Sequence, residues 1–304
     1  MNVTKIPNLL RPKLKEEKDT PRPVKDGLPF VPFTSMIQGS LGTGKTTILC
    51  EWIQMLDEEL KPGVGSIDKI FYFSPTAKLD SKARLLIDGK HNYEIEVFDD
   101  FNMTIFNECC GEVNGVMEKW IMFKKLMKLW KKFVARNYDV DRMSYQEILT
   151  LEEMDFKAPD PPYKHGLTPS FVWVFDDLVG NKDLYKPSPR GDFSKWLLMS
   201  RHLKCSTIFL SQVFQGGLAK QLRGNLNVIA LLRNKSVDAK KSIAMELSSF
   251  IEPEKLVELW DYATEKDHDF FLIDVRSKER QFRRNWDEVL SCGSKNADDL
   301  RSKK

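Results

Sequence analysis

The sequence predicts an α/β protein with a mostly parallel central sheet flanked by helices. Short apolar runs typical of buried strands alternate along the chain with longer segments whose apolar residues recur at helical spacing. A glycine-rich loop separates the first such strand from the first such helix. Polar residues end several of the apolar runs, as expected where buried parallel strands deliver side chains to one edge of a sheet.

The composition is that of an ordinary globular protein and excludes few functions. The 304 residues carry a formal net charge of +3, so total charge neither demands nor excludes a nucleic-acid partner. Five cysteines without metal-ligand spacing favour a reducing, intracellular compartment. No apolar run approaches the roughly 20 residues that a membrane helix needs, so no membrane anchor is expected.

Composition also divides the chain into parts. Residues 1–28, rich in Lys, Arg, Pro and Glu, predict a flexible basic arm, and the polar residues 289–304 predict a flexible tail. Between them, residues 29–288 predict one folded domain that carries a helical insert at 101–160. In this insert, apolar residues from Trp120 to Val134 recur at helical spacing, while six lysines lie mostly elsewhere on the helical wheel. Such a basic face is either solvated or a contact for DNA.

The other elements follow from the periodicity of the apolar residues. The predicted strands are at 30–38, 67–74, 94–98, 171–176, 206–211, 227–232 and 269–275. The predicted helices are at 45–57, 101–135, 191–203, 236–249 and 253–264.

The glycine-rich loop matches the pattern G-x-x-x-x-G-K-[ST] in full. A triphosphate requires several converging backbone N–H donors, and glycines allow the backbone to approach it closely. The N-terminus of the following helix adds free N–H groups and a partial positive charge. We therefore expect the loop to bind ATP, with Lys45 reaching the β- and γ-phosphates and the Thr46 hydroxyl binding Mg²⁺. The predicted nucleotide-binding residues are Gly39, Ser40, Leu41, Gly42, Thr43, Gly44, Lys45, Thr46 and Thr47.

Two carboxylates, Asp176 and Asp177, follow the apolar run at 171–175. A buried strand delivers them to the carboxyl edge of the sheet, where ligands bind in open α/β folds. Asp176 is the expected partner of Mg²⁺, and Asp177 is expected to orient or deprotonate the attacking water. Many ATPases with this layout carry Glu at the second acidic position, and the shorter Asp must lie closer to that water.

A further apolar run, 206–211, ends at Gln212, and an arginine precedes it. A glutamine at such a strand tip can hydrogen-bond the γ-phosphate or the attacking water, or it can cap the next turn. Arg201 is expected to reach the ATP of a neighbouring subunit and to stabilise the transition state. Arg223 and Arg233 are competing candidates for this role.

The sequence resembles the FtsK–HerA superfamily of P-loop ATPases, and within it the poxvirus-type DNA-packaging ATPases of large DNA viruses, virophages and Polinton-like elements. The resemblance covers about residues 30–275 and is carried by the segments GSLGTGKTT, FVWVFDD, SRHLKCSTIFLSQ and HDFFLIDV. The glycine loop is specific only to P-loop NTPases in general. The narrower placement depends on the Arg-His pair that precedes the strand ending in glutamine.

The resemblance implies a P-loop fold of the ASCE type and a ring, hexameric in this family, with ATP sites between subunits. It implies ATP hydrolysis coupled to the movement of double-stranded DNA into a preformed capsid, with a capsid or portal vertex protein as partner. The expected location is the host cytoplasm, a viral factory or the virion. The implied catalytic residues are Lys45, Asp177, Gln212 and Arg201, and the implied metal ligands are Thr46 and Asp176.

Three other functions remain open from the sequence. A plasmid or cellular DNA translocase or helicase needs the same ring and the same ATP chemistry. A P-loop kinase needs a second substrate pocket with a lid, and such kinases lack the glutamine at the strand tip. A nucleotide-gated switch without hydrolysis is disfavoured by the intact lysine and carboxylates.

Overall fold

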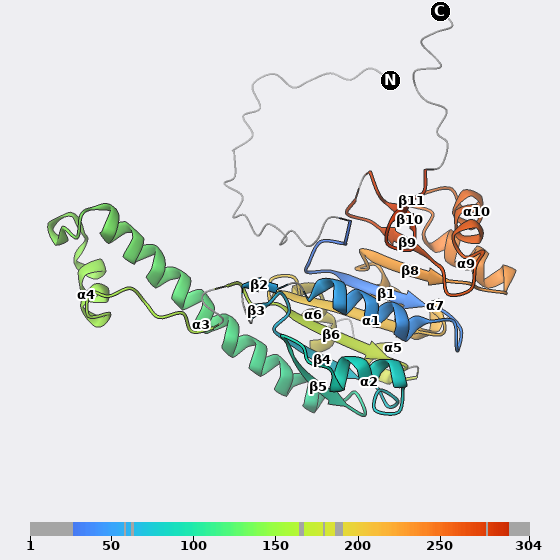
Figure 1. The fold of residues 1–304 in the computed structure, drawn as a ribbon, viewed down its shortest axis with the longest axis horizontal. Coiled ribbons are helices and arrows are strands. Elements are labelled where there is room, and N and C mark those ends of the chain that lie inside the picture. The colour runs from blue at the N-terminus through green and yellow to red at the C-terminus, as the bar shows by residue number, and fades with distance from the viewer. Residues whose placement is uncertain are drawn as a thin grey trace, which may run out of the picture.

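A twisted sheet forms the centre of the molecule (Figure 1). The computed structural model describes residues 27–291 except 58, 62–63, 164–166, 179, 186–190 and 278. Within these residues, nine strands pair in the order β11-β10-β9-β8-β1-β7-β6-β4-β5, and β2 and β3 form a separate hairpin. The predicted arm and tail lie almost entirely outside the described residues.

Six of these strands are parallel, and the rest of the sheet is antiparallel. The parallel strands are β1 (Thr34–Gln38), β4 (Lys69–Phe73), β5 (Glu94–Phe98), β6 (Phe171–Asp176), β7 (Cys205–Ser211) and β8 (Val228–Leu232). The antiparallel edge of the sheet consists of β9 (Phe270–Asp274), β10 (Phe282–Arg284) and β11 (Glu288–Val289). The separate antiparallel hairpin is formed by β2 (Glu59–Lys61) and β3 (Val64–Gly65). Strand β7 separates β1 from β6, which is the order that distinguishes the ASCE type among P-loop folds.

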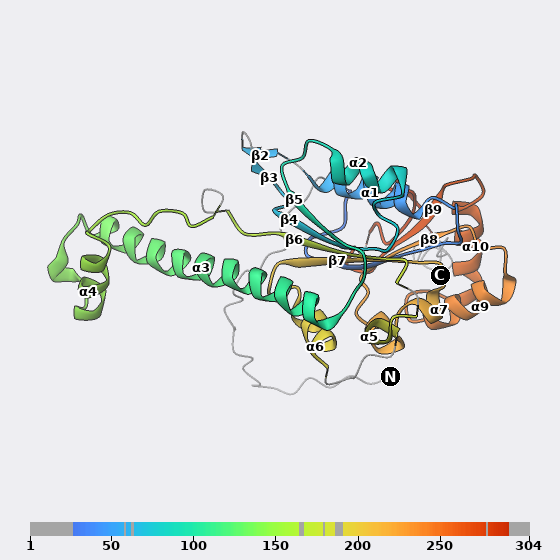
Figure 2. The ribbon, with the colours of Figure 1, turned by 90° about the horizontal axis from the view of Figure 1, so that it is seen from below.

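Helices cover both faces of the sheet, as parallel strands require (Figure 2). Helices α1 (Lys45–Leu56) and α2 (Ser81–Asp88) pack on one face. The opposite face carries the first half of α3 (Met103–Ala135), α5 (Lys182–Tyr185), α6 (Asp192–Met199), α7 (Phe214–Gly217), α8 (Lys220–Arg223), α9 (Val237–Glu246) and α10 (Pro253–Ala263). The fold class predicted from the sequence is confirmed.

The core lies in two layers because side chains alternate along each strand. On β6, Val172 and Val174 face α1, whereas Phe171, Trp173 and Phe175 face α3 and α6. The second layer is rich in aromatic rings: Trp173 lies 4.6 Å from Phe71 and 4.6 Å from Trp196 between ring centroids. Aromatic side chains bury large areas, so this layer contributes strongly to stability.

Helix α3 is the element that departs most from the compact body. Its first half buries Phe106, Cys109 and Val113 against the sheet, and its second half projects well beyond the body (Figures 1 and 2). A 3₁₀ turn (Val140–Arg142) and α4 (Tyr145–Glu153) fold back against the far end. Buried Phe133 and Leu151 hold α4 there, so the tip of the arm has a small core of its own. Among the described residues, no helix is both long and apolar enough to cross a bilayer.

Several element boundaries differ from those predicted. Strand β1 begins at Thr34 rather than at residue 30, since Pro32 has no N–H to donate to a sheet. Helix α6 ends at Met199, and a turn continues to β7. Helix α2 and the edge strands β10 and β11 were not predicted, because each is too short for a clear apolar period.

Replacing the central tryptophan should destabilise the fold. Trp173 is completely buried, so Trp173→Ala is expected to lower the free energy of unfolding by about 3–5 kcal/mol. Urea denaturation measures this change. The control Tyr145→Ala removes a ring that is 75% exposed on the arm, and it should cost less than about 0.5 kcal/mol. Equal losses in both variants would contradict the buried aromatic layer.

Candidate functional site

The glycine-rich loop joins β1 to α1 and is fixed at both ends by its backbone. Gly39 N donates to the carbonyl oxygen of Ser211 at 3.1 Å, which ties the start of the loop to the end of β7. Gly44 caps α1 with φ 109°, a left-handed conformation that favours glycine. No side chain caps the N-terminus of α1, so its first N–H groups remain available to an anion.

Gly39 is required by close packing. A Cβ atom at this position would lie 2.5 Å from Thr43 Oγ1 and 2.8 Å from a methyl carbon of Leu232. Both distances are far below van der Waals contact. The loop therefore folds as tightly as it does because residue 39 has no side chain.

The Lys45 side chain turns back over the loop. Its Nζ donates to the carbonyl oxygens of Gly39 at 3.0 Å and Ser40 at 3.1 Å. Partial burial lowers the pKa of Lys45, while the nearby carboxylates of Asp177 and Asp176 act in the opposite direction. The ammonium group is therefore held between the loop and the acidic end of β6.

Asp176 is a buried carboxylate at the carboxyl end of β6. Burial raises its pKa to about 6, although hydrogen bonds from Tyr72 and Ser74 favour the charged form. The Tyr72 hydroxyl donates to Asp176 Oδ2 at 3.1 Å, and the Ser74 hydroxyl does so at 3.4 Å. These two bonds fix the orientation of a group that a nearby cation would stabilise further.

Asp80 is a third carboxylate near the loop, and it was not predicted from the sequence. The Thr46 hydroxyl donates to Asp80 Oδ2 at 3.3 Å. The other oxygen, Oδ1, accepts from the backbone of Lys82 at 2.7 Å and of Ala83 at 3.2 Å, so Asp80 caps α2. The Asp before a predicted helix start could have been recognised as a cap, but its contact with Thr46 is a property of the fold.

The predicted Mg²⁺ ligands were Thr46 and Asp176, and their chemistry fits the ion. Their oxygens, with that of Asp80, are the hard donors that Mg²⁺ prefers. In the described part of the chain, no three carboxylate, imidazole or thiolate side chains converge as a metal cluster. Mg²⁺ usually takes one or two protein ligands and completes its shell with substrate phosphates and water. A site of that kind is compatible with these residues.

Asp177 and Gln212 are brought together from two neighbouring strands. Gln212 Nε2 donates to the Asp177 carboxylate, at 3.0 Å from Oδ1 and 3.4 Å from Oδ2. Asp177 adopts φ 54°, a left-handed conformation that is uncommon outside glycine and clusters at functional sites. Gln38, at the end of β1, donates to the backbone oxygen of Gln212 at 3.2 Å. Gln212 is thus linked to both the acidic strand and the phosphate-loop strand.

Arg201 does not join this group. It precedes β7, whereas Gln212 follows the same strand, so about 20 Å of extended chain separates them. Arg201 lies beside a small pocket of about 250 Å³ at the amino edge of the sheet, with Arg276 among the neighbouring residues. It cannot reach the phosphate loop of its own subunit.

The two competing arginines are engaged in other contacts. Arg223 is buried and forms a two-pronged ion pair with Glu246, at 2.7 and 2.9 Å. Arg233 lies beside the phosphate loop, where its Nη1 contacts Asp267 Oδ1 at 2.8 Å. Arg223 therefore stabilises the fold, and Arg233 borders the site of its own subunit.

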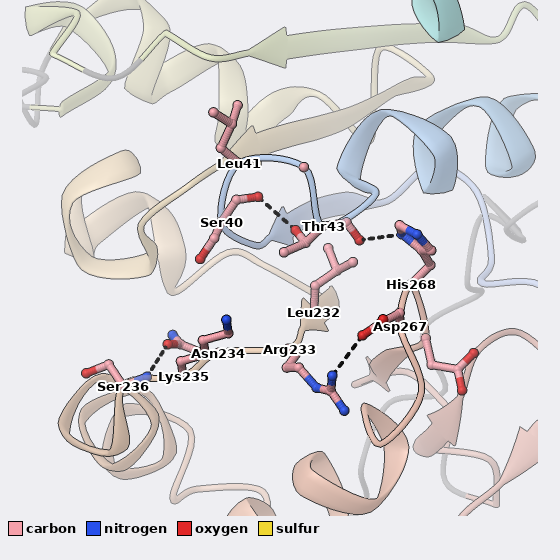
Figure 3. Close-up of a pocket in the computed structure, with 12 residues that line it drawn as sticks. Ser40, Leu41, Thr43, Leu232, Arg233, Asn234, Lys235, Ser236, Asp267 and His268 are labelled. Carbon is pink, nitrogen blue, oxygen red and sulfur yellow. Dashed lines mark hydrogen bonds and ion pairs between the residues drawn. The ribbon is translucent and has the colours of Figure 1, made fainter.

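An open pocket of about 610 Å³ lies beside the phosphate loop (Figure 3). Its walls are residues 40–43 of the loop, residues 232–236 after β8 and residues 267–269 before β9. His268 Nδ1 is 3.3 Å from the Thr43 carbonyl oxygen, a hydrogen bond that requires the tautomer protonated at Nδ1. Of these residues outside the loop, only Arg233 was a candidate functional residue from the sequence. The available signal was that polar residues follow an apolar strand at the carboxyl edge.

No protein-family model matches the sequence, and no curated protein is significantly similar to it. Solved structures show weak similarity. The genome-packaging NTPase B204 of Sulfolobus turreted icosahedral virus 2, in complex with ATP-γ-S, is 15% identical over 85% of this chain and 98% of that chain, with a TM-score of 0.45. B204 of Sulfolobus turreted icosahedral virus, a DNA-packaging ATPase, is 14% identical over 83% and 96%, with a TM-score of 0.47. The cytoplasmic domain of the type VII secretion ATPase EccC of Thermomonospora curvata is 17% identical over 86% and 26%, with a TM-score of 0.43.

Removing the buried charge at residue 176 should stabilise the protein at high pH. Because burial raises the folded pKa of Asp176 from 3.8 to about 6, the charged form costs roughly 3 kcal/mol of stability above pH 6. Below about pH 4 the carboxyl is protonated in both states, and this cost disappears. Without nucleotide, Asp176→Asn should therefore have a higher free energy of unfolding than the wild type at pH 8, and the two should converge at pH 4.

Urea denaturation at the two pH values measures this difference. Asp287→Asn, which neutralises an exposed carboxylate, serves as the control and should change stability by less than about 0.5 kcal/mol. A gain from Asp176→Asn that is the same at both pH values would mean that the titration of Asp176 is not its source.

Proposed function

We propose that this protein hydrolyses ATP with Mg²⁺ and uses the energy to move double-stranded DNA, packaging a viral genome into a preformed capsid. The observation that carries the proposal is the hydrogen bond between Gln212 and Asp177, beside Lys45 and Asp176 at the carboxyl edge of the sheet. At this edge, Asp177 can activate water, Gln212 can respond to the presence of the γ-phosphate, and both lie beside the phosphate-binding loop.

The phosphate loop, residues 39–47, would hold the triphosphate by its backbone N–H groups and by the uncapped N-terminus of α1. Lys45 would exchange its bonds to the Gly39 and Ser40 carbonyls for bonds to the β- and γ-phosphates. The charge of its ammonium group would then stabilise the negative charge that develops on the transferred γ-phosphoryl group and on the leaving ADP.

Thr46 and Asp176 would hold Mg²⁺, and Asp80 would orient the Thr46 hydroxyl. When bound, Mg²⁺ neutralises charge on the β- and γ-phosphates. Tyr72 and Ser74 keep the Asp176 carboxylate directed toward this position by their hydrogen bonds. This arrangement accounts for the burial of a carboxylate that costs stability on its own.

Asp177 would accept a proton from the attacking water, and Gln212 would hold that water in line with the γ-phosphate. The Gln212 amide now donates to the Asp177 carboxylate. A water placed between them could accept from the amide and donate to the carboxylate. Loss of the γ-phosphate would let the direct hydrogen bond between Gln212 and Asp177 form again. Strand β7 would transmit this change in Gln212 to the amino edge of the sheet.

The pocket beside the loop would take the nucleoside. It lies on the side of the loop away from β6, so a nucleotide with its γ-phosphate near Asp177 would direct its ribose and base there. Of the residues that border it, Arg233 offers hydrogen-bond donors to the nucleoside, and His268, with its proton on Nδ1, offers Nε2 as an acceptor (Figure 3).

Arg201 would act on the ATP of a neighbouring subunit in a ring. Its exposed position at the edge opposite the phosphate loop supports action on another subunit rather than on its own. Ring closure would bring the amino edge of one subunit to the nucleotide of the next. A hexamer is the assembly that the sequence resemblance implies, and the same resemblance supports duplex DNA as cargo and a capsid or portal vertex protein as partner. Such a motor would act in the host cytoplasm or a viral factory.

Turnover of ATP should increase when long double-stranded DNA is added at low salt. A steady-state ATPase assay with and without duplex tests this, and Lys45→Ala should reduce the rate about 100-fold or more because a phosphate-binding charge is lost. Lys195→Ala, which removes an exposed lysine of α6, should leave the rate unchanged. If the ATPase rate does not respond to DNA and phosphate is transferred to a small acceptor, the protein is a kinase and not a DNA motor.

Mixed rings should reveal whether Arg201 acts across an interface. Arg201→Ala and Lys45→Ala proteins should each be inactive in ATP hydrolysis. Mixing them creates interfaces in which an intact Lys45 site faces an intact Arg201, so part of the activity should return. Measured across mixing ratios, an absence of any recovery would assign the role to another arginine or to a site complete within one subunit.

A further inference from the structure

The distal half of α3 carries an unbroken run of positive charge. From Lys119 to Tyr138 the chain contains six lysines and Arg136, with no aspartate or glutamate. The same helix begins differently, since Glu108, Glu112 and Glu118 precede this stretch. Charge is therefore segregated along one helix, and the basic part is the part that projects from the body (Figure 1).

Five of these lysines lie on one side of the helix. At 100° per residue, Lys124, Lys125, Lys128, Lys131 and Lys132 fall within about 120° of one another around the axis, and all but the partly exposed Lys132 are exposed. We call the four exposed ones the lysine face. Phe133, which packs against α4, points about 140° away from Lys128. The centre of the lysine face is therefore directed away from the side of α3 that packs against α4.

The lysine face is electrostatically unfavourable for the helix that carries it. Lys128 has lysines at positions i−4, i−3, i+3 and i+4, where like charges on a helix repel. Lys132, which lies within the same arc, forms an ion pair with Glu147 of α4, while Lys124 lies 4.3 Å from the ring centre of Trp120. A chain that needed only a solvated helix could alternate its charges, as the surface of α2 does with Arg84 and Asp88. An anionic partner would relieve the repulsion.

The lysine face stands beyond the sheet on the side opposite the phosphate loop. Lys69, the first residue of β4, forms an ion pair with Glu112 at 2.7 Å, which places this part of α3 at the amino edge of the sheet. Lys124 follows 12 residues later, about 18 Å further along the helix. Changes on this face should therefore not disturb nucleotide chemistry at the carboxyl edge.

We propose that the lysine face of α3 contacts the phosphate backbone of double-stranded DNA. The proposal rests on the proposed function, because it names the surface by which the motor holds its cargo. From Lys124 to Lys131 the helix extends about 10 Å, and the same length of duplex carries roughly six phosphate charges. Long, flexible lysine side chains can follow phosphates of any sequence, which suits a motor that must pass along a whole genome.

The test is the salt dependence of duplex binding by the full chain. In the lysine-face variant, Lys124, Lys125, Lys128 and Lys131 are all replaced by Gln, which keeps the helix propensity and removes four charges. In the control variant, four exposed lysines of the body, Lys90, Lys182, Lys220 and Lys241, are replaced by Gln. Binding to a labelled duplex of mixed sequence is measured between about 50 and 200 mM salt, alongside basal and duplex-stimulated ATPase.

Each phosphate contact contributes about 0.9 to the slope of log affinity against log salt. We expect the lysine-face variant to lose about 3–4 from this slope and to lose duplex stimulation, with basal ATPase unchanged. The control variant should keep the wild-type slope to within about 1.

Three results would overturn the proposal. If the wild type binds and responds to duplex but the lysine-face variant does so equally well, the proposed function stands and this surface serves another partner, such as an acidic protein. If the control variant loses as much affinity, binding is not localised to α3. If the wild type neither binds duplex nor responds to it, the proposed function itself fails.

Discussion

The parallel pairing of β7 with both β1 and β6 is the constraint on which the site depends. Because the three strands run in the same direction, the phosphate loop, Asp176 and Gln212 all emerge at one edge. Register matters as much as direction: Asp176 follows Val172 and Val174 on the face that α1 covers. A slip of one residue would turn this carboxylate toward α3 and remove it from the loop. The bond from Gly39 N to the Ser211 oxygen fixes the loop in the same frame.

Within that frame, the site concentrates interactions that a protein selected only for stability would avoid. Asp176 is a carboxylate whose pKa is raised by burial, and the same burial lowers the pKa of Lys45. The Tyr72 hydroxyl, whose own pKa is also raised, is committed to donating its proton to Asp176. Asp177 adds an uncommon backbone conformation. These costs occur together at the site where the proposed triphosphate and divalent cation would offset them, and the aromatic layer behind β6 contributes compensating stability.

Much of this arrangement could be predicted from the sequence, because long apolar strands and the glycine loop carry strong local signals. The segments at 94–98 and 171–176 were predicted at their observed bounds, and the loop, both carboxylates and Gln212 meet at one edge as expected from parallel strands. Contacts between segments far apart in the sequence could not be predicted from such local signals. The bond from Thr46 to Asp80, the pocket wall at His268 and the placement of Arg201 at the opposite edge depend on how separate loops pack. No periodicity encodes such packing.

The arm poses a different physical problem, because its charges oppose the helix that carries them. Repulsion around Lys128 weakens α3 locally, and isolated helices have little stability to lose. Two buried contacts, one on either side of the lysine face, stabilise the helix: the first half of α3 is buried against the sheet, and Phe133 packs under α4 at the tip. The capping box of Ser144 and Glu147 holds α4 in turn, and Glu147 also pairs with Lys132. A charged helix held at both ends keeps its shape although only Lys132 on this side forms an ion pair with α4, so the exposed lysines of the face would be available to the proposed anionic partner.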